Sequence, residues 1–305
     1  MAVTAQMVKE LREMTGAGMM DCKKALVEAD GDMDKAVEVL REKGLSKAAK
    51  KAGRIAAMGL VKTAFAEDGS AAAMVEVNSE TDFVAKNGEF IEFVENLAKM
   101  VLNHDVKSMD DFMALPYGEE GTVQEALTAK IAKIGENMNI RRFEKYAEPG
   151  VKYTGYIHNN GQIGVIVGLK TDADAADIQT VGKDVAMQVA SMSPKFVDDT
   201  EVDQAWLENE KKIAREQLLN EGKKEELLDK IIPGKVKALL KEVCLVEQKF
   251  VKDADMTVKQ YVDGVASGLG KEMAVKTMAR YEVGEGIEKK EEDFAAEVAA
   301  QMAGK

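Results

Sequence analysis

The chain has 305 residues, a length that suits two or three domains of ~150 residues each. Hydrophobic residues make up 46% of it, which argues against disorder, and a low content of aromatic residues and prolines favours helices. The 54 acidic residues outnumber the 42 basic ones and give a net charge of −12. This charge argues against a protein that binds nucleic acid mainly through the phosphate backbone.

The sequence lacks the features that would place the chain outside the cytoplasm. Its two cysteines, Cys22 and Cys244, are too few for a disulfide framework and suit a reducing compartment. No apolar run reaches the ~18 residues needed to span a membrane. The first residues also lack the basic region and apolar stretch of an export signal. We therefore expect a cytoplasmic protein that is not held in a membrane.

Residues 1–45 predict a compact module of three helices. Apolar residues recur at helical spacing in three stretches, which are separated by glycine-containing turns at 15–18 and 30–32. Gly44 is expected to end the third helix. Each apolar stripe is too small to be buried alone, so the three helices should pack on one another.

Residues 46–58 predict a basic linker helix. Four basic residues would share one face of it: Lys47, Lys50, Lys51 and Arg54. This face is either solvated or a contact for an acidic partner, and the residues alone leave both interpretations open.

The middle of the chain predicts a duplicated α+β core. In the first half, 59–148, strands at 59–66 and 71–77 form a hairpin, helices follow at 89–102 and around 123–134, and a strand at 139–143 closes the unit. The second half, 149–198 and 247–284, repeats this order, but its closing strand is delayed until 279–283. Each half should form a small antiparallel sheet with helices on it.

Residues 199–246 delay that closing strand and look inserted. Apolar stripes on both sides of Gly222 predict two antiparallel helices, with Pro233 as a break in the second stripe. The helical hairpin is either a surface for a partner or a local structure with no special role.

The sequence supplies little for enzymatic chemistry. Its two histidines, His104 and His158, are far apart, and neither a zinc-type cluster nor a nucleophile motif occurs. Cys22 lies on an apolar helical stripe, which indicates a core position. The stretch 264–271 differs from a phosphate-binding loop, because Glu272 stands where Ser or Thr would hold magnesium. We expect no catalytic residue, no metal site and no cofactor.

The stretch Asn78 to Asn87 stands out because it follows a strand and opens a helix. Thr81 or Asp82 can cap that helix, whose N-terminal dipole favours a carboxylate. The residues alone allow two interpretations of Phe83. It is either a core side chain beside a helix cap or a rigidly presented aromatic residue that inserts into another protein.

Six stretches, spread over nearly the whole chain, resemble those of one known protein family. One of them is Thr-Asp-Phe-Val-Ala-Lys-Asn at 81–87. The others are 8–12, 15–26, 134–142, 283–289 and 293–298. In this order they resemble the family of bacterial elongation factor Ts, which are nucleotide exchange factors of the GTPase elongation factor Tu.

The resemblance implies an α+β fold in four parts. These are a ubiquitin-associated-like module at 1–45, the duplicated core, a coiled coil at 199–246 and a C-terminal helical module at 285–305. The section 199–252 departs most from the family pattern, because Lys252 stands where an apolar residue is expected.

The resemblance also implies how the chain would act on elongation factor Tu. Phe83 would insert between two helices of the partner's nucleotide domain, Mg²⁺ would be dislodged, and GDP would leave. The residues with this role would be Thr81, Asp82, Phe83 and Val84. Auxiliary contacts to a helix of the partner's nucleotide domain would come from Arg12, Met19 and Met20, with the C-terminal helix near Phe294 close by. His158 would face the partner through the second half of the core.

Two other classes of function compete with this interpretation. An RNA- or ribosome-binding module would use the basic face of 46–58 together with Arg141 and Arg142, but the net charge and the lack of clustered aromatic residues oppose it. An enzyme would need acid–base groups that the chain hardly offers. We therefore expect a GTPase partner, no nucleotide bound by the chain itself, and no nucleic acid.

Overall fold

Three short helices open the structure, a computed structural model that describes residues 3–15 and 17–288. They are α1 (Ala5–Thr15), α2 (Met19–Glu28) and α3 (Met33–Ala49). Their apolar stripes meet in one small core, in which Leu11, Cys22 and Leu26 are fully buried. The three predicted helices are confirmed, and Cys22 is a core residue.

The third helix is longer than predicted, and Gly44 does not end it. Gly44 lies buried inside α3, where this helix packs on α7 (Val123–Ile134). A Cβ atom placed on Gly44 would lie 3.6 Å from the Cβ of Ala132, so a larger side chain would push the two helices apart. Gly44 therefore does not end the helix but lies at a helix–helix contact that has room for a Cβ atom and not for a large side chain.

The basic linker also differs from its prediction. The helix ends at Ala49 and turns follow, so the four basic residues of 46–58 do not share one helical face. Three of them have partners within the chain. The Nζ of Lys47 lies 2.7 Å from Asp21, the Nζ of Lys51 lies 2.7 Å from the carbonyl oxygen of Gly135, and Arg54 lies 3.5 Å from Glu80.

The first half of the core is an antiparallel sheet in the order β1-β2-β3. Its strands are β1 (Met58–Phe65), β2 (Ala72–Ser79) and β3 (Met138–Tyr146). Helices α5 (Gly88–Asn103), α6 (Met109–Met113) and α7 contribute to the core on one face of this sheet, where Phe90, Phe93 and Phe112 are buried. The predicted hairpin, helices and closing strand are confirmed.

The second half repeats this arrangement with the order β4-β5-β8. Its strands are β4 (Val151–His158), β5 (Ile163–Thr171) and β8 (Met273–Glu282), and its helices are α8 (Gln179–Met192) and α11 (Val258–Leu269). The delayed closing strand is confirmed, and the α+β fold class with it. The sequence did not reveal α11 or the short strands β6 (Lys249–Phe250) and β7 (Asp253–Thr257).

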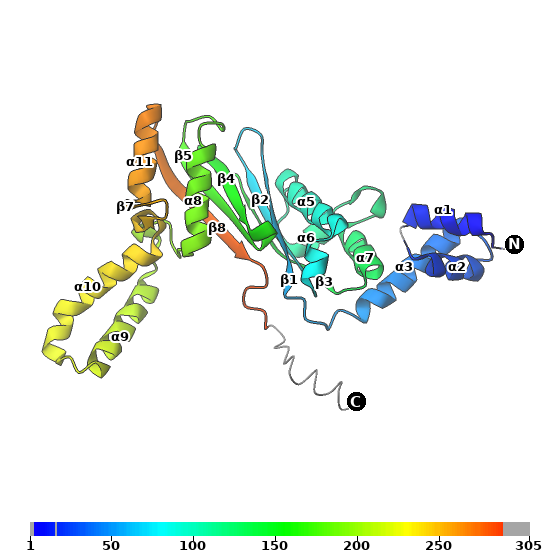
Figure 1. Cartoon of the computed structure of the whole chain (residues 1–305), viewed down its shortest axis with the longest axis horizontal. Helices are drawn as coiled ribbons and strands as arrows, with labels where there is room; N and C mark the ends of the chain where they lie inside the picture. Colours follow the sequence, from blue (N-terminus) through cyan, green and yellow to red (C-terminus); the bar gives the residue numbers. More distant parts are fainter. Residues whose placement is uncertain (1–2, 16, 289–305) are drawn as a thin grey trace.

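The two sheets pack on each other through a shared apolar layer. Val61 and Met74 from the first sheet meet Tyr153, Ile166 and Tyr281 from the second. Glycine makes this approach possible, because a Cβ atom on Gly164 of β5 would lie only 2.3 Å from the side chain of Val61. The halves thus form one continuous body (Figure 1).

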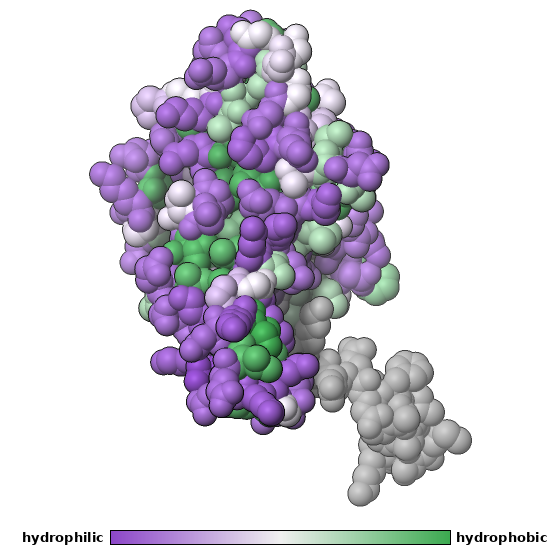
Figure 2. Space-filling model, turned by 90° about the vertical axis from the view of Figure 1, so that its left-hand side faces the viewer, coloured by the Kyte–Doolittle hydropathy of each residue, from purple (hydrophilic) through white to green (hydrophobic). Residues whose placement is uncertain are grey.

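The inserted residues form a helical hairpin of α9 (Gln204–Asn220) and α10 (Glu225–Val243), as predicted. Gly222 adopts a φ of +78° in the turn between them. Pro233 does not break α10, because apolar residues on both sides of it continue to face α9 and line a groove with Leu207. The hairpin projects from the core at the end opposite the N-terminal helices (Figure 1), and Figure 2 shows apolar side chains among the charged ones on that side of the molecule.

Short elements complete the described chain. They are α4 (Asp82–Ala85), η1 (Gly118–Glu120), η2 (Asn159–Gly161), η3 (Asp199–Glu201) and η4 (Leu245–Glu247). Of the C-terminal module expected at 285–305, residues 289–305 with Phe294 lie outside the described residues. No helix within the described ranges is long and apolar enough to cross a membrane.

Candidate functional site

Phe83 is the most exposed large hydrophobic side chain of the described residues, with 79% of its surface accessible. It lies on α4, a single helical turn that directly follows β2. The next residue, Val84, is only 6% exposed and belongs to the core of the first half. The interpretation of Phe83 as a core residue is therefore wrong, and Val84 is the side chain of this turn that packs inside.

Thr81 fixes the start of α4, as the sequence predicted. Its Oγ1 accepts a hydrogen bond of 3.4 Å from the backbone N–H of Val84 and donates one of 2.7 Å to Oε1 of Glu136. The backbone N–H of Thr81 donates to Oε2 of the same carboxylate at 3.0 Å. Glu136 thus holds both the backbone and the side chain of the capping residue.

A second contact braces the loop in front of α4. Oε1 of Glu80 accepts a hydrogen bond of 2.5 Å from the backbone N–H of Asn137, and the amide of Asn137 donates to the carbonyl oxygen of Arg54 at 2.7 Å. The loop is therefore tied to residues that follow α7 in the chain. Because this support orders the loop in advance, Phe83 can contact a partner with little further loss of conformational entropy.

The sequence-based interpretation missed Glu136 as a supporting residue. Glu136 and Thr81 are 55 positions apart, and no local pattern connects them. The only signal was that Glu136 lies in the stretch 134–142, which carries part of the family resemblance.

Asp82 places a negative charge beside the exposed ring. Its carboxylate forms an ion pair of 2.7 Å with Lys86 one turn later, and it lies in the first turn of α4, where the helix dipole favours an acid. The hydrogen bond from Lys86 and the charge of its ammonium group hold the pKa of Asp82 below its ordinary value, although desolvation opposes them. Asp82 is therefore ionised at neutral pH.

The predicted auxiliary residues of the N-terminal module are exposed. Met19 is 57% and Met20 61% accessible at the start of α2, and Arg12 is exposed on α1. Met20 also lines a shallow groove with Val27 and nearby lysines. This module packs on the first half through α3 and α7, and Phe83 is not among the residues that line the groove at Met20.

His158 lies exposed at the end of β4, where its Nδ1 is 3.0 Å from the hydroxyl oxygen of Tyr156. The turn η2 that follows it packs on β1, and the side chain of Gln162 donates to the carbonyl oxygen of Gly59 at 3.3 Å. Helix α4 also packs on β1, next to the strand end where Met58 pairs with Ser79. The structure therefore brings Phe83 and His158, one from each half, to the same end of β1.

The residues considered for metal binding or nucleophilic chemistry were located in the structure. No group of His, Cys, Asp and Glu among them has the arrangement to hold a metal ion. Burial raises the pKa of the Cys22 thiol, and burial with nearby acids raises that of Cys244 to about 11, so both thiols are protonated at neutral pH. The glycines of the stretch 264–271 lie in and at the end of α11, which excludes a phosphate-binding loop there.

Comparison with known proteins gives a consistent result over nearly the whole chain. Residues 80–285 match the family model described as elongation factor TS. The chain is 53% identical to elongation factor Ts of Clostridium novyi and 54% identical to that of Clostridioides difficile, in both cases over 98% of this chain and 99% of the relative. It is 52% identical to the same factor of Clostridium kluyveri over 99% of this chain and the full relative. The chain therefore belongs to the elongation factor Ts family of translation elongation factors.

Proposed function

We propose that the chain is the guanine nucleotide exchange factor of elongation factor Tu in the cytoplasm. It would bind the GDP-bound GTPase, dislodge Mg²⁺ and release GDP, so that GTP can bind. The observation that supports this most is the exposed ring of Phe83 on a turn held by Glu136. Burying a phenylalanine side chain contributes roughly 1.5–3 kcal/mol, and this favours a site that is covered by a partner.

The mechanism requires no chemistry from the chain itself, so we propose an exchange factor rather than an enzyme. A GTPase holds its nucleotide through contacts to the phosphates and to Mg²⁺, which requires near-ideal octahedral geometry. Insertion of Phe83, with the charge of Asp82 beside it, would shift the surroundings of that ion. Exchange is then a reciprocal coupling: the factor weakens nucleotide binding as much as nucleotide weakens binding of the factor.

The remaining contacts would hold the partner while Phe83 inserts. We propose this role for Arg12, Met19 and Met20 on the N-terminal module at 1–45, and for His158 in the second half. Helix α3 of the module packs on α7 of the first half, and this packing holds the module in place relative to Phe83. The partner would thus be contacted by both halves of the core and by the module.

The competing RNA-binding function loses support from the structure. Five of the six basic residues that it would use have acidic or carbonyl partners within the chain: Lys47 with Asp21, Lys51 with the carbonyl oxygen of Gly135, Arg54 with Glu80, and Arg141 and Arg142 with the buried Glu76. Few of these charges remain free to bind phosphates.

Release of labelled GDP from elongation factor Tu tests the proposal. Stopped-flow traces are compared with and without the chain, in the presence of excess unlabelled nucleotide. We expect release to accelerate with increasing concentration of the chain until it saturates. A release rate that does not depend on the chain would refute the proposal.

A further inference from the structure

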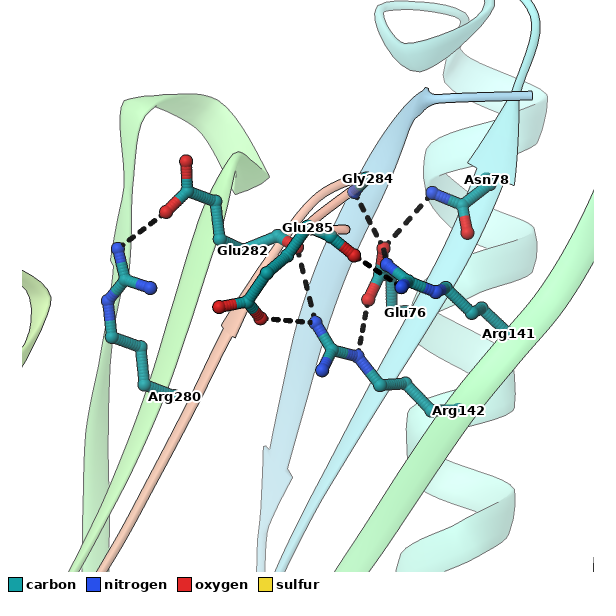
Figure 3. Close-up of polar contacts among 8 residues, drawn as sticks. All are labelled: Glu76, Asn78, Arg141, Arg142, Arg280, Glu282, Gly284 and Glu285. Atoms are coloured by element: carbon teal, nitrogen blue, oxygen red, sulfur yellow. Dashed lines mark hydrogen bonds and ion pairs between the residues drawn. The ribbon is translucent and has the colours of Figure 1, made fainter. Parts of the chain in front are cut away.

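Glu76 is a fully buried carboxylate in the middle of β2, with none of its surface accessible. It accepts four hydrogen bonds: from Nε of Arg142 at 2.6 Å, the backbone N–H of Gly284 at 2.8 Å, Nδ2 of Asn78 at 3.0 Å and Nη1 of Arg141 at 3.1 Å (Figure 3). A buried charge is tolerated only when its partners satisfy it, and here they do.

The donors come from both halves of the core. Arg141 and Arg142 belong to β3 of the first sheet, whereas Gly284 follows β8 of the second (Figure 3). Arg142 also donates to the carbonyl oxygen of Glu282 at 3.2 Å and pairs with the carboxylate of Glu285 at 3.1 Å. Its guanidinium lies 4.0 Å from the centre of the Tyr281 ring.

An irregularity in the first sheet allows both arginines to reach Glu76. Neighbouring residues of a regular strand point to opposite faces, so only one of two consecutive arginines would face a given carboxylate. The pairing of β2 with β3 shifts between Glu76 and Val77: Glu76 lies opposite Arg142, but Val77 lies opposite Ile140. Arg141 is the extra residue of this bulge, and the bulge redirects its side chain.

We propose that Glu76 and its two arginines lock the two sheets in one relative orientation, so that Phe83 and His158 act on the partner as parts of one rigid body. The apolar layer between the sheets is non-directional, so it fixes their relative orientation less sharply than hydrogen bonds do. Charge-assisted hydrogen bonds are directional, and they join β2 and β3 to the end of β8.

This proposal rests on the proposed exchange function and refines it. Insertion of Phe83 distorts the nucleotide site of the partner, and this costs free energy. The free energy of binding at the other contacts offsets that cost. If the sheets could turn relative to each other, the partner would stay bound through the second half and the N-terminal module while Phe83 remained outside. The lock should therefore affect the maximal rate of GDP release more than the binding of the partner.

The first test replaces Glu76 by glutamine, which keeps the shape but removes the charge that both arginines need. We expect Glu76→Gln to lower the maximal rate of GDP release about fivefold, while the concentration for half-maximal rate changes less than about twofold. Rates are divided by the folded fraction, measured by circular dichroism. An unchanged rate per folded molecule would overturn the proposal.

The matched control is Asp184→Asn. Asp184 is also a buried carboxylate, and it accepts hydrogen bonds from Lys252 at 2.5 Å and Tyr261 at 2.8 Å, all within the second half. This variant should lose stability but keep its exchange rate per folded molecule. A loss of rate equal to that of Glu76→Gln would show that any buried ionic network has this effect and would refute a specific lock.

A second readout measures the orientation directly. Nitroxide labels are attached through Lys99→Cys on α5 and Lys183→Cys on α8, both exposed, whereas the native cysteines are buried. We expect pulsed electron resonance to show a broader distance distribution for Glu76→Gln than for the unaltered chain or for Asp184→Asn. Equal widths would contradict the lock even if the chain accelerates GDP release. If the unaltered chain does not accelerate release, the proposed function fails, and the distances still test the lock.

A milder variant covers the case that Glu76→Gln does not fold. Arg141 is partly exposed, and Arg141→Gln leaves Glu76 with Arg142, Asn78 and Gly284. We expect the same two effects at reduced size. A folded Arg141→Gln chain with an unchanged rate and unchanged distances would also overturn the proposal.

Discussion

At the scale of single residues, the function proposed here depends on which side of a helical turn faces solvent. Phe83 and Val84 are both apolar, and the residues alone do not decide which of them is buried. The structure buries Val84 in the core of the first half and leaves the ring of Phe83 exposed. The cap at Thr81 was predictable from local chemistry, whereas its support by Glu136 depends on a distant part of the chain.

Phe83→Ala should reduce the acceleration of GDP release at least tenfold and leave the melting temperature nearly unchanged. An aromatic anchor at an interface contributes about 2 kcal/mol or more, and a loss of ~1.4 kcal/mol in the step that strains the nucleotide site is already tenfold. The control is Phe90→Ala, the same change at a buried position, which should cost ~3–5 kcal/mol of stability. Stopped-flow release and thermal melting are measured on the same samples. A large fall in the melting temperature of Phe83→Ala with normal exchange would make Phe83 a packing residue.

Asp82→Ala should reduce exchange less than Phe83→Ala, and its effect should shrink when free Mg²⁺ is low. The carboxylate is exposed and pairs with Lys86, itself exposed, so its loss should hardly affect folding. Its proposed role is to disturb the surroundings of the partner's Mg²⁺, and this contributes little when the ion is already scarce. GDP release is measured over a series of Mg²⁺ concentrations, with Lys86→Ala as the control for loss of the ion pair. A defect that is the same at all Mg²⁺ concentrations would argue against this role.

At the scale of elements, periodicity predicted most of the helices and strands, with α11 among the exceptions, but single residues expected to end elements were misleading. Gly44 and Pro233 both lie inside helices, α3 and α10, because packing against α7 and α9 outweighs their local preference. The bulge at Glu76 could not be predicted either, since an acidic residue within a strand usually indicates a solvent-facing position. These features depend on contacts between segments that are distant in the sequence.

Gly44→Ala should stabilise the chain by up to ~1 kcal/mol. Glycine inside a helix costs about this much relative to alanine, and the added Cβ would meet Ala132 at 3.6 Å, an ordinary van der Waals distance. Gly44→Leu should instead separate α3 from α7 and lower the stability. Urea unfolding of the three chains checks this order. If both variants were destabilised equally, the contact between α3 and α7 would be closer than the structure shows.

At the scale of the whole molecule, the parts form a row from the N-terminal helices to the inserted hairpin (Figure 1). The two halves of the core meet in the middle of this row, and each contributes one predicted contact to the end of β1. The sequence indicated the duplication, because both halves repeat the same order of elements. It did not indicate how the halves are joined, since Glu76 and Gly284 are 208 positions apart.

This junction should make the stability of the chain sensitive to acid. Burial raises the pKa of Glu76, but hydrogen bonds from Gly284, Arg142 and Asn78 outweigh it and hold the pKa below the ordinary 4.5. A carboxylate whose pKa is lower in the folded state stabilises that state above its unfolded pKa, and this contribution is lost as the pH falls through the folded pKa. The contribution should therefore be constant from pH 7 down to about 5 and decline at lower pH.

Urea unfolding of the unaltered chain and of Glu76→Gln, at pH 7 and at about pH 3.5, isolates this contribution. Other acids with lowered pKa values, such as Glu89 and Glu125, titrate in both chains and cancel in the difference. Because glutamine does not titrate, the stability advantage of the unaltered chain should shrink between the two pH values. An advantage that stays the same at both would mean that folding does not lower the pKa of Glu76, and an advantage that grows at the lower pH would mean that Glu76 is protonated in the folded chain at pH 7. In that case the two arginines would have no charged partner in the core, and the lock between the sheets would lose its physical basis.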